Sequence, residues 1–196
     1  MPKIVDPEAR REEVVEAVFR VVRRDGIEQA SLRNVANEAG LAIGSVRHYF
    51  DSHTELMVFA MRAMSERVGA RLMAHLETLP EDPRKAAVAM LCELLPLDER
   101  RRDEATVWLA FAMAARTRPE LQPHAAKVHD DMRRLVGRVL EGAQRLGRLP
   151  KDADLELETE RLCALIDGLS VEAILQPDRI APETMTRVLL RQLDAW

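Results

Sequence analysis

Prolines and glycines divide this chain of 196 residues into segments whose lengths suit helices rather than strands. A proline opens or ends a helix because its φ is fixed and it lacks an amide hydrogen, and a glycine commonly follows the last helical residue. Between these breaks apolar residues recur at helical spacing, as at Val15, Val18 and Val22. The predicted helices cover about residues 7–25, 31–39, 43–49, 52–79, 83–95, a stretch through 108 to 117, 123–147, 155–175 and 182 to the end.

The composition agrees with an all-α chain. The chain is 47% hydrophobic and 32% charged with a net charge of only −4, which is a globular balance and excludes disorder. Seven aromatic residues are present, and the apolar mass is mainly Ala, Leu, Val and Met, which favour helices. No apolar run approaches the roughly 18 residues of a membrane span, and no signal peptide opens the chain. We therefore expect a cytoplasmic protein without a membrane partner.

Residues 31–50, SLRNVANEAGLAIGSVRHYF, predict two short helices joined by a tight turn. Ser31 caps the first helix, Ala36 is small where the second helix crosses, and Gly40 supplies a left-handed turn residue. This is the helix-turn-helix pattern, whose second helix enters the DNA major groove. The alternative is that the short helices merely pack together and their polar residues are solvated.

Outward positions of the second short helix carry side chains that suit DNA. Arg47 can read guanine or bind a phosphate, Ser45 and Tyr49 can donate to phosphates, and Ile43 can touch a thymine methyl group. His53 lies in the first turn of the next helix, where free amides favour a phosphate. The complete set predicted to contact DNA is Ser31, Arg33, Ala42, Ile43, Ser45, Arg47, His48, Tyr49 and His53.

The charge balance limits how this DNA contact can work. Nucleic-acid binders are often basic, yet residues 1–55 contain eight Lys and Arg against ten Asp and Glu. Binding must therefore depend on a few well-placed cations, and we expect it to weaken steeply as salt rises.

RREEVVEAVFRVVRRDGIEQASLRNVANEAGLAIGSVRHYFDSHTEL resembles the DNA-binding domain of the TetR family of transcriptional repressors. The likeness rests on the first-helix pattern, the AG turn, the GSVRHYF run and the Ser52-x-x-Glu55 start of a long connecting helix. It implies an all-helical homodimer whose two heads occupy adjacent major grooves of a palindrome. We expect a three-helix DNA-binding head in residues 1–53 and a helical bundle for effector binding and dimerisation in residues 54–196.

Three positions depart from the family pattern. The family usually has Ser at 42, Tyr at 47 and Lys at 53, where this chain has Ala42, Arg47 and His53. The loss of a hydroxyl and of a fixed charge weakens phosphate anchoring, while Arg47 returns one permanent charge and changes the preferred operator.

The second half resembles, more loosely, the regulatory domain of the BetI-like branch of the family, through WLAFAMAARTRPEL, GRLPKDADLE and LIDGLSVEAILQPDRIAPETM. This implies a small-molecule pocket, and flexible Met with a few aromatic residues suits an adaptable apolar lining. Any one of these residues can equally be core, and Asp167 can be a pocket contact or a hydrogen-bonded core carboxylate. The predicted effector-pocket residues are Met57, Met61, Met64, Met90, Leu94, Trp108, Phe111, Ala112, Met132 and Asp167.

In the family the last two helices build a four-helix dimer interface, and both carry apolar stripes in this sequence. Gly168 in mid-helix costs about 1 kcal/mol relative to Ala, which suggests either a tight crossing with the other subunit or an internal kink. The predicted interface comprises Leu162, Leu165, Ile166, Leu169, Ala173, Met185, Val188, Leu189 and Leu193.

The sequence therefore predicts a ligand-responsive regulator, most often a repressor, that binds a double-stranded DNA operator as a homodimer. We expect no catalytic residues, no cofactor and no metal site, because no histidine pair has helical metal spacing and no nucleophile motif is present. Two alternatives stay open: a helical ligand-binding or interaction protein whose head no longer grips DNA, and a DNA binder without an effector.

Overall fold

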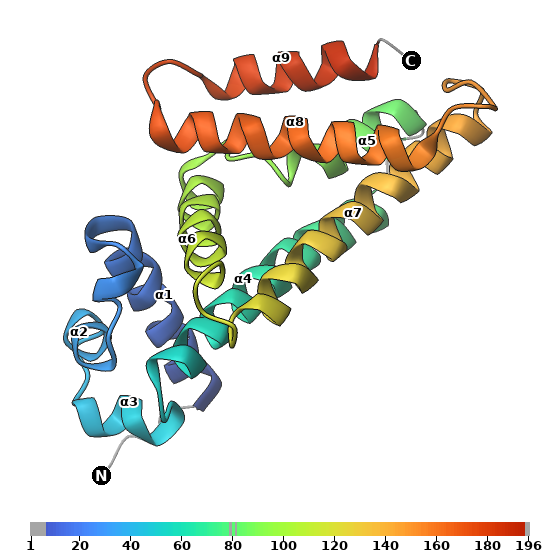
Figure 1. Cartoon of the computed structure of the whole chain (residues 1–196). Helices are drawn as coiled ribbons and strands as arrows, with labels where there is room; N and C mark the ends of the chain where they lie inside the picture. The colour runs from blue at the N-terminus through green and yellow to red at the C-terminus, as the bar shows by residue number, and fades with distance from the viewer. Residues whose placement is uncertain (1–6, 79, 81, 195–196) are drawn as a thin grey trace. The chain divides into compact units, whose positions relative to one another are not determined.

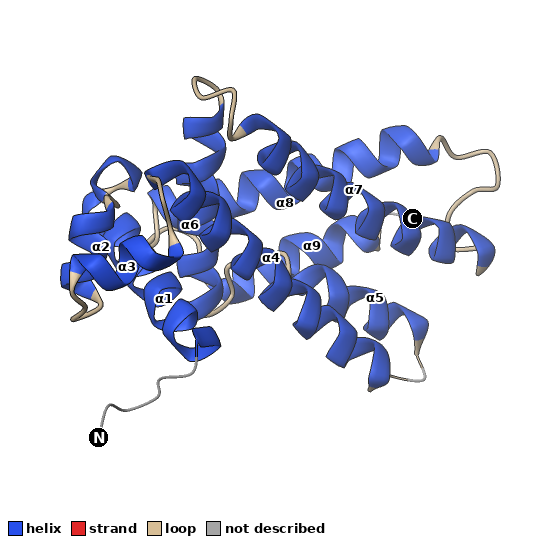
Figure 2. Ribbon diagram, turned by 90° about the horizontal axis from the view of Figure 1, so that it is seen from below, coloured by secondary structure: helices blue, strands red, loops and turns tan. Residues whose placement is uncertain are grey.

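The computed structural model describes residues 7–78, 80 and 82–194 (Figure 1). All regular structure in these residues is helical and none is strand (Figure 2), so the all-α prediction is confirmed. No helix in this part of the chain is both long and apolar enough to cross a membrane. The elements are α1 (Pro7–Asp25), the 3-10 turn η1 (Ile27–Gln29), α2 (Leu32–Glu38), α3 (Ile43–Tyr49), α4 (His53–Glu77), α5 (Pro83–Cys92), α6 (Glu99–Ala115), α7 (Gln122–Arg145), α8 (Leu155–Leu175) and α9 (Pro182–Leu193).

Side-chain caps fix several helix starts where the sequence indicated them. The Ser31 hydroxyl accepts a hydrogen bond from the Asn34 amide at 3.2 Å and so begins α2. The Asp154 carboxylate accepts from two amides in the first turn of α8. At α4 the Glu55 amide donates to the Ser52 hydroxyl at 3.1 Å, and the Glu55 carboxylate accepts from the Asp51 amide at 2.7 Å. These bonds satisfy amides that have no partner within a helix.

Two boundaries between α5 and α6 differ from the prediction. The charged run DERRRDE was expected to separate helices, but α6 begins at Glu99 inside it, and α5 ends at Cys92 rather than near residue 95. The reason for the early start is that Asp98 caps α6, accepting from the Arg101 amide at 2.8 Å. The charged residues of this run therefore form the first turns of α6.

The chain forms two compact units. The first comprises residues 1–66 and 106–125, and the second comprises residues 67–105 and 126–196, so α4, α6 and α7 each contribute to both. In the first unit Val14, Val18, Val35 and Val46 are fully buried. In the second, α5, α7, α8 and α9 share a core, and α8 and α9 run side by side (Figure 1). Fully buried members of that core are Leu91, Val136, Leu140, Leu162, Met185 and Leu189.

A polar group built around buried Glu104, here called the Arg71 cluster, lies in the second unit; its other members, Arg71, His75, Glu93 and Arg101, are half-buried. Arg71 donates to Glu104 at 2.7 and 3.0 Å and to Glu93 at 2.6 Å, and His75 Nε2 lies 3.1 Å from Glu93. Burial opposes ionisation of Glu93, yet the hydrogen bonds from His75 and Arg71 and the charges of Arg101 and Arg71 together lower its pKa. The cluster ties α4, α5 and α6 together.

Candidate nucleic-acid interface

The turn between α2 and α3 determines the direction of α3. Gly40 has φ +66°, the left-handed region that glycine adopts without a steric penalty. The Leu41 amide donates to the Ala36 carbonyl at 2.8 Å and the Gly40 amide donates to the Asn37 carbonyl at 3.2 Å. This paired arrangement is a Schellman motif. It ends α2 sharply and starts α3 three residues after Gly40, as the sequence predicted.

One face of α3 is anchored and the other is open. Val46 is fully buried, whereas Ser45, Arg47 and His48 on either side of it are exposed. Phe50, directly after the helix, is 3% exposed, and its ring centroid lies 5.1 Å from that of Phe59. The apolar contacts therefore hold a seven-residue helix whose remaining face carries the polar groups predicted to meet DNA.

Two arginines of α1 pair with an acidic residue of α2. Glu38 accepts hydrogen bonds from Arg20 at 2.8 Å and from Arg24 at 2.9 Å, and these bonds lower the pKa of its carboxyl group. By contrast, Arg33 and Arg47 are exposed and form no ion pair with the described residues. The head is thus acidic in total but presents unpaired cations locally, which is what DNA binding by an acidic chain requires.

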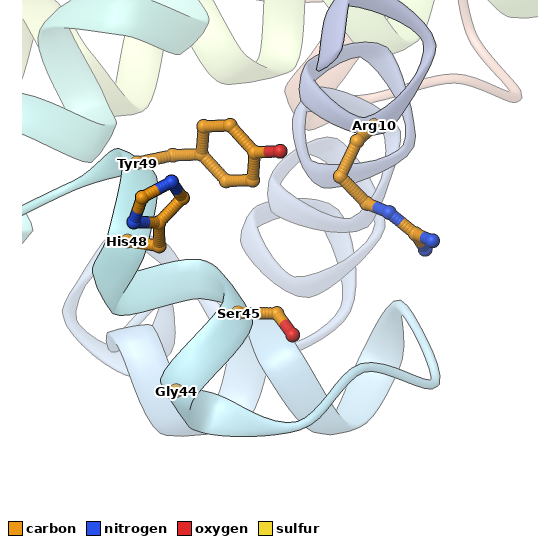
Figure 3. Close-up of a pocket in the computed structure, with 5 residues that line it drawn as sticks. All are labelled: Arg10, Gly44, Ser45, His48 and Tyr49. Atoms are coloured by element: carbon orange, nitrogen blue, oxygen red, sulfur yellow. The ribbon is translucent and has the colours of Figure 1, made fainter. Parts of the chain in front are cut away.

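A hollow of about 490 Å³ opens beside α3 and is lined by Arg10, Gly44, Ser45, His48 and Tyr49 (Figure 3). Figure 3 shows the hydroxyl groups of Ser45 and Tyr49 and the guanidinium of Arg10 around the same space. A cation and two hydroxyl donors around one hollow suit a phosphate oxygen. Three predicted DNA-binding residues are therefore brought together here, and Arg10 and Gly44 are added to them.

Arg10 was not predicted, although α1 contains a signal for it. It lies one turn before Val14 on the helix row that is buried further along at Val18. A charged residue at the end of a row of apolar residues on a helix lies at the edge of the core. From there its side chain can reach a neighbouring element. Arg10 also donates to Glu13 at 2.7 Å, which holds the guanidinium near the hollow.

Arg11, the next residue, ties α1 to the end of α3. Its guanidinium carbon lies 5.8 Å from the centroid of the Tyr49 ring and 5.9 Å from that of the Phe59 ring. Both distances suit a cation–π contact. The Tyr49 ring is thereby held while its hydroxyl reaches the hollow.

Three other predicted DNA-binding residues have constrained surroundings. The Ser31 hydroxyl is engaged in capping α2. Ala42 is the N-cap of α3 and forms no side-chain cap. His53 is half-buried in the first turn of α4, and its Nε2 atom is buried with no hydrogen-bond partner. Their contact with DNA stays a prediction.

The ten predicted effector-pocket residues are divided between the two units. Met57, Met61 and Met64 are buried in the first, while Leu94 and Met132 pack against the core of the second. None of the ten lines the hollow beside α3 or a second hollow of about 530 Å³ near residues 147–153. Burial raises the pKa of Asp167, while the nearby charges of His129 and Arg133 oppose that rise. Of the remaining members, Phe111 is buried, whereas Met90, Trp108 and Ala112 are half-buried. The pocket stays a prediction.

The predicted dimer residues stay a prediction, and most of them are buried within the single chain. Seven of the nine are buried in the chain's own core, because α8 and α9 turn their most apolar faces toward α5 and α7. Leu165 and Val188 are only partly buried. The α8 helix continues unbroken through Gly168, where an added Cβ would meet nothing within 4 Å. A kink or tight internal crossing is therefore not the reason for this glycine. The seven core residues are Leu162, Ile166, Leu169, Ala173, Met185, Leu189 and Leu193.

A helix-turn-helix head with an exposed second helix, continued by a helical unit with its own core, defines a DNA-binding transcriptional regulator. A family model for the C-terminal domain of BetI-type transcriptional repressors matches residues 83–196. The chain belongs to the TetR family of transcriptional regulators, in its BetI-type branch.

Individual relatives agree with this assignment along the whole chain. The regulator PksA of Bacillus subtilis is 36% identical over 198 residues, which cover 100% of this chain and 93% of PksA. BetI of Vibrio campbellii is 27% identical over 195 residues, covering 99% of this chain and 95% of BetI. The crystal structure of a transcriptional regulator from Rhodococcus sp. Rha1 has a TM-score of 0.81 at 36% identity and covers 94% of each chain.

Proposed function

We propose that this regulator binds a palindromic operator as a homodimer and represses transcription until a small-molecule effector releases it. Each α3 enters one major groove, and the two half-sites lie about 34–36 Å apart, one turn of DNA. The observation that carries the proposal is α3 itself, anchored by fully buried Val46 with Arg47 exposed and unpaired among the described residues. A bacterial transcriptional regulator of this family acts in the cytoplasm, and no catalytic step is assigned to this one.

Contacts on α3 divide into base reading and backbone binding. Arg47 reads base edges from the open face of the helix, and half-buried Ile43 contacts a base from the first turn of α3. Ser45 and Tyr49, together with Arg10, bind a phosphate in the hollow beside α3. Arg33 on α2 is a second exposed cation available to the duplex. The remaining predicted contacts, Ser31, Ala42, His48 and His53, complete the proposed interface.

The experiment is a gel shift with the DNA upstream of the protein's own gene. Arg47→Ala removes the exposed cation, and we expect the dissociation constant to rise about tenfold or more, since one good base contact contributes about 1–3 kcal/mol. Arg138→Ala is the matched control, because Arg138 is an exposed arginine on α7. Equal affinity of Arg47→Ala and wild type would contradict the assignment.

The effector part of the proposal has its own test. An effector shifts a two-state regulator only by its differential affinity for the two states. A metabolite that raises the melting temperature and weakens operator binding supports release by ligand. A protein that binds its operator but responds to no metabolite in a broad panel would be a DNA binder without an effector.

The competing function is an interaction protein whose head no longer binds DNA specifically, and Ala42, His53 and the acidic head favour it. Selection of genomic fragments at low and at physiological salt separates the two functions. An enriched palindrome supports the regulator, and the absence of any enriched sequence at both salt concentrations supports the interaction protein.

A further inference from the structure

The hollow beside α3 is lined by one side chain of a type whose charge depends on pH near neutrality. His48 is exposed on α3 and lines the hollow together with Arg10, Ser45 and Tyr49 (Figure 3). Histidine ordinarily changes charge between pH 5 and 8, whereas arginine, serine and tyrosine side chains change charge only well outside that range. The positive charge that the hollow offers to a phosphate therefore depends on the state of His48.

The imidazole of His48 is held against the end of α3. Its ring centroid lies 5.2 Å from that of Tyr49, and the two ring planes are inclined by 68°, which is an edge-to-face contact. The Tyr49 ring is itself held by Arg11, whose guanidinium carbon lies 5.8 Å from the ring centroid. Figure 3 shows the His48 and Tyr49 rings side by side at the border of the hollow. The imidazole thus borders the same space as the two hydroxyl groups proposed to bind a phosphate.

The charged groups around His48 come from two helices. From α1, Arg10 lines the hollow and donates to Glu13 at 2.7 Å. On α3 itself, Arg47 is the exposed neighbour of His48. Among the described residues that line the hollow none is acidic, and none comes from α2 or α4. The lining therefore offers no carboxylate to an imidazolium, and a bound phosphate would supply the missing negative charge.

We propose that operator binding takes up a proton from solvent at His48 of each head, so that affinity for the operator rises as pH falls. A phosphate in the hollow favours the charged imidazole and accepts a charge-assisted hydrogen bond from it. The proposed interface has only three arginines, Arg10, Arg33 and Arg47, so one further cation in each head is a large addition. The inference rests on the proposed operator binding and adds pH as a second determinant of it.

Thermodynamic linkage gives the direction of the effect. The complex holds more protons than the separated protein and DNA, so the association constant is largest at low pH and falls as pH rises through the histidine range. Each head takes up at most about one proton, so log affinity falls by at most about 1 per pH unit for each head and about 2 for a dimer. We expect the dissociation constant to be at least about tenfold lower at pH 6 than at pH 8.

The test uses the full-length protein and a fluorescent duplex from the DNA upstream of its own gene. Binding is measured by anisotropy between about pH 6 and 8 at constant ionic strength, because salt alone changes the affinity. His48→Gln keeps a hydrogen-bonding side chain without a charge, and its affinity should stay at the low wild-type value of pH 8. His48→Arg carries a permanent charge, and its affinity should stay high across the same range. Opposite plateaus of the two variants distinguish a charge effect from a general loss of fit.

Proton uptake can also be counted directly. Calorimetric titration of the same duplex in two buffers of different ionisation enthalpy should show uptake by the wild type near pH 7 and a smaller uptake by both His48 variants. His124→Gln is the matched control, because His124 lies in the first turn of α7 and outside the proposed interface. It should keep the wild-type dependence on pH. Circular dichroism at each pH checks that the helices persist.

The outcomes separate this inference from the proposed function. A wild-type protein that binds no operator at any pH would contradict the regulator itself. Operator binding that is equally tight at pH 6 and pH 8 would overturn only the role of His48. The same holds for a pH dependence that His48→Gln leaves unchanged.

Discussion

At the scale of single residues, Glu104 is the one charged side chain that is buried among the described residues, with 4% exposure. Both of its oxygens accept hydrogen bonds from Arg71, at 3.0 and 2.7 Å. Arg71 also binds Glu93 at 2.6 Å, so one guanidinium is shared by two carboxylates. A buried charge of this kind is tolerated only while its partner remains.

Removing either member of this pair should lower the stability of the protein. Glu104→Ala leaves Arg71 with one of its three hydrogen bonds, the one to Glu93. We expect the free energy of unfolding to fall by about 3 kcal/mol, the order found when a buried pair loses one member. Glu104→Gln should lose less because it keeps an acceptor oxygen. Urea denaturation measures both, with Glu141→Ala on the exposed face of α7 as the control. A loss below about 1 kcal/mol for Glu104→Ala would contradict a structural role for this pair.

The sequence could not reveal this residue. Glu104 stands in the run DERRRDE, which has the composition of a solvated surface. Its burial depends on Arg71, which lies 33 positions earlier. Pairing across such separations leaves no periodic pattern, whereas the turn at Gly40 was predicted from local sequence alone.

At the scale of elements, two glycines near α3 have opposite roles and form a matched pair. Gly40 has φ +66°, so Gly40→Ala puts a Cβ into the left-handed region and should destabilise the protein by about 1–2 kcal/mol. Gly44 is helical, and an added Cβ meets nothing within 4 Å. Gly44→Ala should therefore stabilise α3 by about 0.5 kcal/mol. Thermal unfolding distinguishes them, and equal effects of the two variants would contradict the role given to the turn.

Helix ends were predictable wherever one residue type determines them. Gly40, Ser52 and Asp154 each end or cap a helix through hydrogen bonds that their own chemistry dictates. Helix faces were less predictable, because α8 is apolar on two sides. A prediction based on hydrophobicity chooses the face of α8 that is richest in leucine and isoleucine. In the structure that face packs against the chain's own core.

At the scale of the whole molecule, the net charge of −4 means that the global field repels DNA. Attraction must come from cations placed beside α3, such as Arg47 and Arg10. Ion pairs such as those of Arg20 and Arg24 with Glu38 neutralise positive and negative side chains together. The charge that acts on DNA is therefore the local charge that these pairs leave over. The net charge counts paired and unpaired side chains alike. For this reason the composition argued against DNA binding while the helix-turn-helix argued for it.

The dependence of operator binding on salt measures how many such cations act. Each phosphate contact adds about 0.9 to the slope of log affinity against log salt. If Arg10 binds a phosphate in the hollow beside α3, Arg10→Ala should lower the slope by about 1 for each head, hence about 2 for a dimer, and weaken all sequences alike. Arg47→Ala should instead reduce discrimination between operator and random DNA, because a base contact carries the sequence information. Gel shifts between about 50 and 200 mM salt, with Arg138→Ala as control, separate these roles. An unchanged slope for Arg10→Ala would remove Arg10 from the interface, and a loss of discrimination would make it a base reader.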